Sequence, residues 1–264
     1  MALTPKQNFM QACLDQLASR LNQDLTRLEK STGERDNFLE IMEKIVGSSI
    51  VKIHSKIVEG FPNSSIDFQE TEMYTPEEDA DGSKFIVVTL GGGKNMSHAF
   101  EHVYMAMAFV DEKGQTTDAL VYNPFSDEKF NVGYSNGAFS DISRIRIGNR
   151  KDTCDFAIYL NKETADEKEF NKSVALLNDE ITQGNPVHMS NACLLDMILV
   201  AGGKKDAFIA SGITSHELEI IKLFALEAGC TLTDFKSNKP SDKTSSIVMT
   251  NSKLHAKILN RLNK

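Results

Sequence analysis

The sequence lacks several features that would place a protein in a class at once. Tryptophan is absent, and the four cysteines (Cys13, Cys154, Cys193 and Cys230) form no CxxC pair. Cysteines this far apart are typical of buried free thiols and argue against a disulfide framework. No apolar run approaches the length of a membrane span, and the first residues contain no apolar signal core. We therefore expect a cytoplasmic protein that does not bind membranes.

Negative charge outweighs positive charge in this sequence. The 29 Lys and Arg residues are outnumbered by 37 Asp and Glu residues, and the formal net charge is -8. Because binding to a phosphate backbone needs a basic face, this balance argues against nucleic acid as a general partner. The apolar content of 41% and the charged content of 25% are those of an ordinary globular protein. A chain of 264 residues can bury a large core, as one domain or as two closely packed ones.

The most distinctive segment joins a predicted strand to three glycines and a lysine. Residues 85–90 form a continuous apolar run, which is typical of a strand buried on both faces. Gly91, Gly92, Gly93 and Lys94 follow directly. Backbone N–H groups and a lysine at the end of a buried strand suit an anion. The alternative is that the glycines bind no ligand and simply fill the available space.

Hydrophobic periodicity indicates two helices at the start of the chain, followed by a largely antiparallel sheet. Apolar residues at helical spacing predict helices over residues 9–28 and 38–58. Residues 63–83 are polar and predict a loop. The strands that follow are predicted at residues 85–90, 102–110, 119–122, 129–134 and 142–147.

After residue 150 the pattern changes to alternating strands and helices. The predicted strands are residues 155–160, 207–210, 231–234 and 246–250. The predicted helices are residues 167–178, 191–200, 215–227 and 254–262. These patterns indicate layered helices and sheets. We expect an α+β half over residues 1–150, an α/β half over residues 151–264, and a cleft between them.

Two other groups of residues have both a structural and a functional interpretation. His98 and His102 are four residues apart, as zinc ligands on a helix require, but a zincin would also need a glutamate at position 99. His216 and Glu217 follow Ser215, a plausible helix N-cap, and an early glutamate suits the helix dipole. The alternative for Glu217 is a general base or a residual metal ligand.

Several segments, taken in order, resemble the inositol monophosphatase family of phosphomonoesterases. They are residues 61–62, 119–130, 133–139, 200–208 and 226–229. The resemblance spans about residues 10–235 and implies the layered α-β-α-β-α sandwich, an α+β fold, that this family shares with fructose-1,6-bisphosphatase. It also implies dependence on Mg²⁺ and a homodimer.

The resemblance places the family's first two metal-binding motifs on changed residues. The Gly-Glu-Glu motif aligns so that its first, metal-binding glutamate falls on Gln69, with Glu70 beside it. The core motif, Asp-Pro-Ile/Leu-Asp-Gly-Thr, aligns with residues 88–93. Its two aspartates become Val88 and Gly91.

The third motif keeps a carboxylate. The family's Trp-Asp pair becomes His216-Glu217, and the core threonine that helps to activate water becomes Gly93. Of four expected metal carboxylates, Glu217 alone remains at an aligned position. Since Mg²⁺ needs anionic oxygen ligands and phosphoryl transfer relies on positioning and charge, we predict that metal catalysis of the family type is absent or very weak.

Three hypotheses about function remain open. The first is a pseudoenzyme that keeps the phosphatase fold and binds or regulates a partner protein. The second is an active phosphomonoesterase for inositol phosphate or a related small phosphate ester. It would use a rebuilt metal site of Gln69, Glu70 and Glu217, with Glu70 and Glu217 as catalytic groups. The third is a metal-free sensor of a phosphorylated metabolite, held by residues 91–94. The cofactor is accordingly either Mg²⁺ or none.

Overall fold

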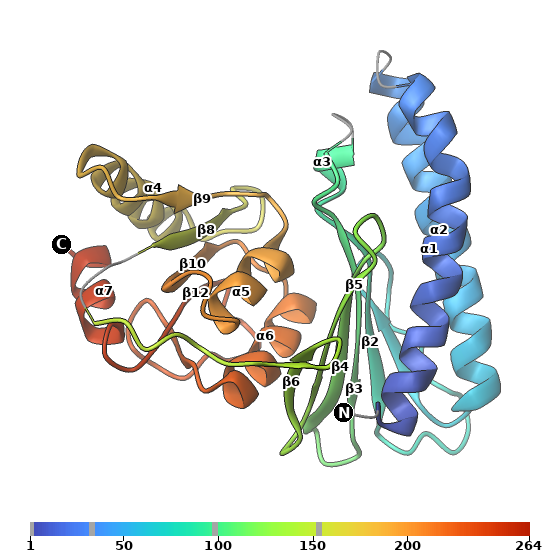
Figure 1. Cartoon of the computed structure of the whole chain (residues 1–264). Coiled ribbons are helices and arrows are strands. Elements are labelled where there is room, and N and C mark those ends of the chain that lie inside the picture. The colour runs from blue at the N-terminus through green and yellow to red at the C-terminus, as the bar shows by residue number, and fades with distance from the viewer. Residues whose placement is uncertain (1–2, 32–34, 97–99, 152–154) are drawn as a thin grey trace. The chain divides into compact units, whose positions relative to one another are not determined.

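The structure, a computed structural model, describes residues 3–31, 35–96, 100–151 and 155–264. It divides into two compact units, which Figure 1 shows coloured along the chain. The first unit holds Met1–Tyr134 and Ser140–Ile142, and the second holds Ser135–Phe139 and Ser143–Lys264. Each unit has its own buried core, so each is described by itself.

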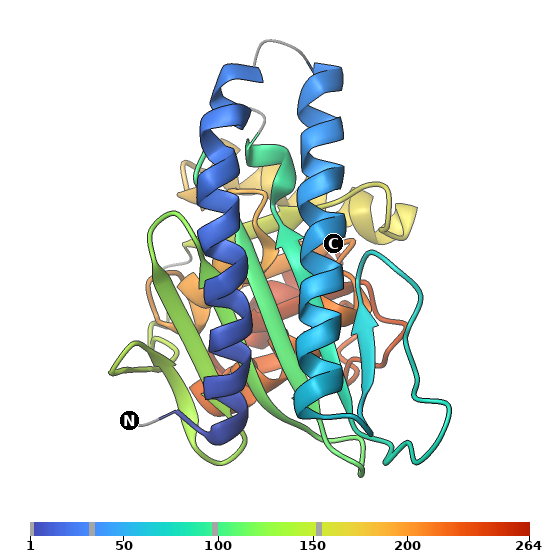
Figure 2. The ribbon, with the colours of Figure 1, turned by 90° about the vertical axis from the view of Figure 1, so that its right-hand side faces the viewer.

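Two long helices form one layer of the first unit. α1 (Pro5–Ser31) and α2 (Arg35–Gly60) lie side by side against the sheet, as Figure 2 shows. Both predicted helices are confirmed. α2 ends at Gly60, because Pro62 cannot continue a helix and restricts the residue before it. Buried side chains of α1 recur at helical spacing, and they include Met10, Cys13, Leu14, Leu17 and Leu21.

The first sheet is largely antiparallel, as predicted. Its strand order is β1-β2-β3-β4-β5-β6-β7. β1 runs parallel to β2, whereas β2, β3, β4 and β5 pair antiparallel in turn. The strands are β1 (Ser65–Phe68), β2 (Lys84–Gly91), β3 (Tyr104–Val110), β4 (Thr116–Asn123), β5 (Glu128–Gly133), β6 (Gly137–Ser140) and β7 (Ser143–Ile145).

Strand β1 corrects the prediction of a loop over residues 63–83. Its side chains alternate, with Ile66 and Phe68 buried and Ser65 and Asp67 half-buried. This is the period of two expected of a strand with one buried face. Four residues are too few for the alternation to stand out among polar neighbours. The strand predicted at residues 142–147 is likewise shorter in the structure, where β7 has three residues.

A group of phenylalanine rings joins the helices to the sheet in the core of the first unit. The ring of Phe61 lies 4.8 Å from that of Phe9 and 4.9 Å from that of Phe85, centroid to centroid. The rings of Phe85 and Phe109 are 5.0 Å apart. These edge-to-face contacts come from α1, the end of α2 and neighbouring strands, and such pairs stabilise a core beyond the area that they bury.

The second unit has a five-stranded sheet in the order β11-β12-β10-β8-β9. β8, β9 and β10 run parallel, and β12 pairs antiparallel with both β10 and β11. β11 is therefore an edge strand. Both β11 and β12 have the bounds that the sequence predicted. The strands are β8 (Phe156–Leu160), β9 (Val187–His188), β10 (Ala207–Ser211), β11 (Thr231–Asp234) and β12 (Ser246–Thr250).

Four helices cover the two faces of this sheet. α4 contacts α7 and packs with it on one face, whereas α5 and α6 contact each other on the other face. The helices are α4 (Glu167–Thr182), α5 (Cys193–Ala201), α6 (Ser215–Ala228) and α7 (His255–Leu262). A short turn, α3 (Gly93–Met96), belongs to the first unit. No described helix has the length and apolar character that crossing a membrane requires. The predicted α+β class is confirmed.

Candidate functional site

The end of strand β2 has no room for a side chain at position 91. Gly91 pairs with Tyr104 of β3, and the tyrosine is 1% exposed. A Cβ atom built on Gly91 would lie 2.0 Å from Cζ of the Tyr104 ring. Carbon atoms that are not bonded approach to about 3.5–4.0 Å. The ring of Tyr104 therefore fills the space that an aspartate at position 91 would need.

The two following glycines differ in what they require. Gly92 has φ of +73°, in the left-handed region where glycine carries no steric cost, and its carbonyl accepts a hydrogen bond from the Asn95 N–H at 2.9 Å. A Cβ on Gly93 would lie 3.5 Å from Leu90, an ordinary contact. Lys94 is exposed on the short turn α3. Close packing thus accounts for Gly91, and the left-handed backbone conformation accounts for Gly92. Lys94 offers a cation at the surface.

The Glu70 carboxylate accepts hydrogen bonds from a backbone donor and a side-chain donor at an irregularity in strand β2. The register of β2 with β3 shifts between Val88 and Gly91. The Glu70 carboxylate accepts hydrogen bonds there from the Thr89 N–H at 3.2 Å and the Thr89 hydroxyl at 3.1 Å. Burial is the largest influence on this carboxyl and raises its pKa, while the hydrogen bonds oppose that shift. Gln69 continues the strand pairing, since its N–H donates to the Val87 carbonyl at 2.9 Å.

Glu217 belongs to the N-terminal cap of α6. The predicted N-cap, Ser215, is wrong, because the cap residue is Thr214. The Thr214 hydroxyl accepts from the Glu217 N–H at 3.2 Å, and a Glu217 carboxylate oxygen accepts from the Thr214 N–H at 2.9 Å. This reciprocal pair is a capping box. The Thr-x-x-Glu pattern that predicts it is present in the sequence, one residue before the position we chose. Glu217 is 3% exposed.

The structure brings together some of the predicted site residues. Gln69 and Glu70 follow β1, and residues 91–94 begin at the last residue of the neighbouring strand β2, all in the first unit. Glu217 lies in the second unit. Within the described part of the chain, no group of three or more His, Cys, Asp or Glu residues is arranged to hold a metal ion. In the first unit, the donors at the positions aligned with the first motif are the uncharged amide of Gln69 and the carboxylate of Glu70, whereas Mg²⁺ prefers several anionic oxygen ligands.

The predicted histidine pair is described in part. His98 lies outside the described residues. The ring of His102 stacks on the exposed ring of Phe100, with centroids 4.4 Å apart and the planes 5° from parallel. Nothing in the described segment supports a zinc site, and the prediction for these histidines stays open.

Three of the four cysteines have thiols that are protonated at neutral pH. Burial raises the pKa of Cys13 to about 11 and that of Cys230 to about 12. The pKa of Cys193 is raised well above its ordinary value, by burial first and then by the charges of Glu217 and Asp196. They are free thiols, as predicted. A thiolate nucleophile is not available at these positions.

Sequence reasoning missed a buried polar cluster in the second unit. Asp196, in the first turn of α5, is fully buried. Its carboxylate accepts from the Ser190 hydroxyl at 2.5 Å and lies 3.2 Å from Nε2 of His188. Burial is the main cause that lowers the pKa of His188. Asp196 contacts both Ser190 and His188, whereas in a catalytic triad the histidine lies between the serine and the aspartate. The cluster therefore differs from a triad, and its contacts hold the start of α5 in place.

Comparisons with known proteins agree with the architecture. The sequence model of the inositol monophosphatase family matches residues 6–264. The chain is 27% identical to the Nus factor SuhB of Xylella fastidiosa, over 58% of this chain and 55% of that relative. It is 27% identical to an inositol-1-monophosphatase of Rhizobium meliloti, over 64% of this chain and 63% of that relative. The crystal structure of the extragenic suppressor protein suhB from Bartonella henselae superposes with a TM-score of 0.81 at 19% identity, over 99% of each chain.

Proposed function

Because the chain belongs to the inositol monophosphatase family, we propose that it keeps the family fold without the metal-dependent phosphatase reaction and acts as a binding or regulatory protein. The observation that carries this proposal is the Tyr104 ring, which occupies the place of any side chain at Gly91. Gly91 aligns with the second aspartate of the family's core motif. The aspartate is missing from this position, and a neighbouring ring fills its place. Together these two features support a site that no longer binds a metal ion.

The surviving carboxylates support the same conclusion. Glu70 accepts hydrogen bonds from Thr89, and Glu217 accepts from the N-cap of its own helix. Both groups therefore already have protein donors as partners. Mg²⁺ prefers anionic oxygen ligands and binds weakly where they are replaced by amides or missing.

The named relatives are compatible with a role other than catalysis. Some carry the name of a phosphatase, and others carry the name Nus factor. Relatives of this chain thus include proteins whose names do not denote phosphatases. For this chain we propose a binding role only. A homodimer, a cytoplasmic location and a division of the chain near residue 150 are parts of the proposal that rest on resemblance and composition.

The second candidate is an active phosphomonoesterase with a rebuilt metal site. Gln69 and Glu70 are adjacent beyond the end of β1, and Glu217 keeps a carboxylate at an aligned position. These residues would be the metal ligands, acting on inositol phosphate or a similar small ester. Calorimetric titration with Mg²⁺ and Mn²⁺ separates the two candidates.

Under our proposal, neither ion gives a saturable heat at millimolar concentration, and Glu217→Gln leaves the titration unchanged. Saturable binding that is lost in Glu217→Gln but kept in Glu219→Gln would favour the phosphatase. Glu219 is the matched control, because it lies in the first turns of the same helix and pairs with Lys222 at the surface.

A further inference from the structure

Positive charge is concentrated at the C-terminal end of the chain. Residues 235–264 contain seven Lys and Arg residues and one acidic residue, Asp242. Residues 1–234 contain 22 Lys and Arg residues and 36 Asp and Glu residues. The net charge of -8 therefore averages over two regions of opposite sign, and it does not describe the surface of the basic segment. A charge asymmetry of this kind is typical of proteins that bind a polyanion.

One asparagine side chain brings together three lysines of the second unit. The Lys172 ammonium, on α4, donates a hydrogen bond to the side-chain oxygen of Asn263. The Asn263 amide donates to the Phe235 carbonyl at 2.9 Å, and Lys236 is the next residue after Phe235. Lys264 directly follows Asn263. Lysines from α4, from the turn after β11 and from the end of α7 thus lie around Asn263.

The outer sides of α4 and α7 add two more lysines. Lys168 is exposed and lies four positions before Lys172, so both project from one side of α4. Lys257 is exposed on α7, whose buried side chains include Ile258 and Leu259. The two helices contact each other on one face of the sheet, as Figure 1 shows. We call the following five side chains the basic face: Lys168, Lys172, Lys236, Lys257 and Lys264.

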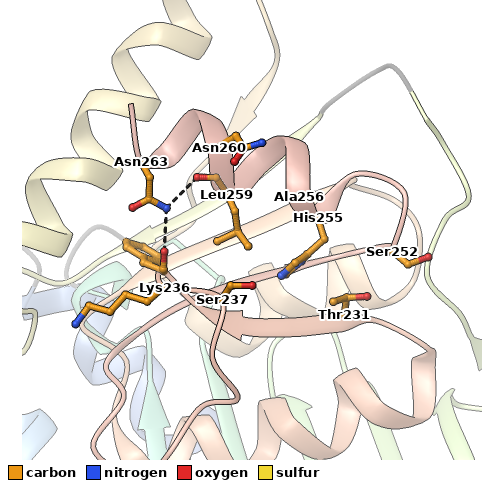
Figure 3. Close-up of a pocket in the computed structure, with 10 residues that line it drawn as sticks. Thr231, Lys236, Ser237, Ser252, His255, Ala256, Leu259, Asn260 and Asn263 are labelled. Carbon is orange, nitrogen blue, oxygen red and sulfur yellow. Dashed lines mark hydrogen bonds between the residues drawn. The ribbon is translucent and has the colours of Figure 1, made fainter.

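The Lys236 side chain is directed outward. Figure 3 shows it extending away from the hollow between α7 and the turn after β11. The neighbouring Asp234 carboxylate is held by donors of its own turn, since it accepts from the N–H groups of Lys236 and Asn238 at 2.8 and 2.7 Å. Asp242 lies 3.4 Å from the ammonium of Lys222, on α6. Both carboxylates of this region therefore have partners other than the Lys236 ammonium.

Carboxylates on the two helices offset part of the charge of the basic face. α7 contains no Asp or Glu. On α4, Glu180 is fully buried and forms an ion pair with Arg261. Glu167 and Asp179 are exposed on α4. Five lysines thus outnumber two exposed carboxylates, and the surface that α4, α7 and the turn form together is positive.

The basic face offers little apolar surface to a partner. Within residues 235–264, all of which the structure describes, no large apolar side chain is exposed, and Phe235 is 1% exposed. The exposed Val174 is two positions from Lys172 and lies on the opposite side of α4. Protein interfaces are depleted in lysine and depend on aromatic and arginine anchors. Single-stranded nucleic acid is held by stacking on aromatic side chains. A face of lysines without exposed rings therefore favours a duplex.

We propose that the basic face binds the phosphate backbone of double-stranded nucleic acid without reading its sequence. A duplex carries one negative charge per about 1.7 Å of its axis, so lysines spread over two helices and a turn would each meet a phosphate. The exposed Ser237 and Asn260 would donate to further phosphate oxygens. This inference goes beyond the proposed function and does not depend on the loss of phosphatase chemistry.

Fluorescence anisotropy with a labelled DNA duplex of about 20 base pairs tests the proposal. If about four phosphates are neutralised, Kd should rise about 100-fold between 50 and 200 mM salt. Lys236→Gln/Lys257→Gln should reduce the slope of log Kd against log salt by about 2. Lys162→Gln/Lys204→Gln is the matched control: both lysines are exposed in the second unit outside the basic face, and the net charge changes equally. Since all four lysines are exposed, both variants should keep the unfolding midpoint.

Four results would overturn the proposal. The first is no binding of the duplex at 50 mM salt. The second is a slope that the control variant reduces as much as Lys236→Gln/Lys257→Gln does, which would mean that net charge alone matters. The third is tighter binding of a single-stranded oligothymidine than of the duplex. The fourth is a poly-glutamate peptide that competes as well as the duplex at equal charge, which would indicate an acidic protein partner. None of these results bears on phosphate release or on Mg²⁺, so failure here and failure of the proposed function are distinguishable.

Discussion

Replacing Gly91 by alanine would drive a methyl group into the ring of Tyr104. The new Cβ would lie 2.0 Å from Cζ of the ring, which is about 1.5–2.0 Å inside ordinary carbon contact. Both residues are buried and paired across β2 and β3, so neither can move away without disturbing the sheet. Overpacking a well-packed core costs about 1–3 kcal/mol. We expect Gly91→Ala to reach the upper end of that range, about 3 kcal/mol.

Urea unfolding, followed by circular dichroism, measures this cost. Gly93→Ala is the matched control, because its Cβ would meet Leu90 at an ordinary 3.5 Å. Alanine there should be neutral or stabilise by about 0.5 kcal/mol, since it reduces the entropy of the unfolded chain. Tyr104→Ala alone should cost about 3–5 kcal/mol through the cavity that it leaves.

The double variant supplies the decisive comparison. If the ring and the glycine share one space, Gly91→Ala should cost about 2–3 kcal/mol less in the Tyr104→Ala background than in the wild type. Costs that simply add would refute the reasoning, because they would mean that the two positions do not compete. A Gly91→Ala variant as stable as Gly93→Ala would refute it as well.

The remaining predictions concern the second unit. Thr214→Ala should lower the free energy of unfolding by about 1 kcal/mol through loss of the capping box, whereas Ser215→Ala should change it little; urea unfolding of both would contradict the cap assignment if the order were reversed. Glu227→Ala should cost about 1–3 kcal/mol, because two backbone N–H groups of the β5–β6 turn lose their acceptor; an unchanged midpoint in thermal unfolding would contradict this. Burial lowers the pKa values of His188 and His255 from 6.5, so the unfolded chain binds these protons more tightly. Their contribution to stability is then fully present above pH 6.5 and is lost as pH falls below it. Unfolding at pH 7.5 and 5.5 should show a smaller drop in His255→Gln than in the wild type, and an equal drop would argue against the assignment.

Elements with a long periodic signal were predictable from the sequence. α1 and α2 carry many turns of apolar residues at helical spacing, and β11 and β12 are bounded by clear turn residues. β1 was not predictable, because four residues carry too little alternation. Helix and strand periodicity report on local structure, so they succeed where an element is long enough to repeat.

The contact between Tyr104 and the position of Gly91 was not predictable from the sequence. Alignment on neighbouring motifs placed Gly91 where a metal ligand was expected, but nothing local indicates that Tyr104, thirteen positions later in the chain, fills that place. The contact arises from the register between β2 and β3, which depends on the whole sheet. Thr214 differs, since its capping pattern with Glu217 is local and was available in the sequence.

Release of phosphate from inositol 1-phosphate in the presence of Mg²⁺ tests the central claim most directly. The account predicts that the purified chain releases phosphate no faster than a reaction without protein, and that Glu217→Gln changes nothing. Turnover that requires Mg²⁺ and falls at least tenfold in Glu217→Gln, but not in Glu219→Gln, would contradict it.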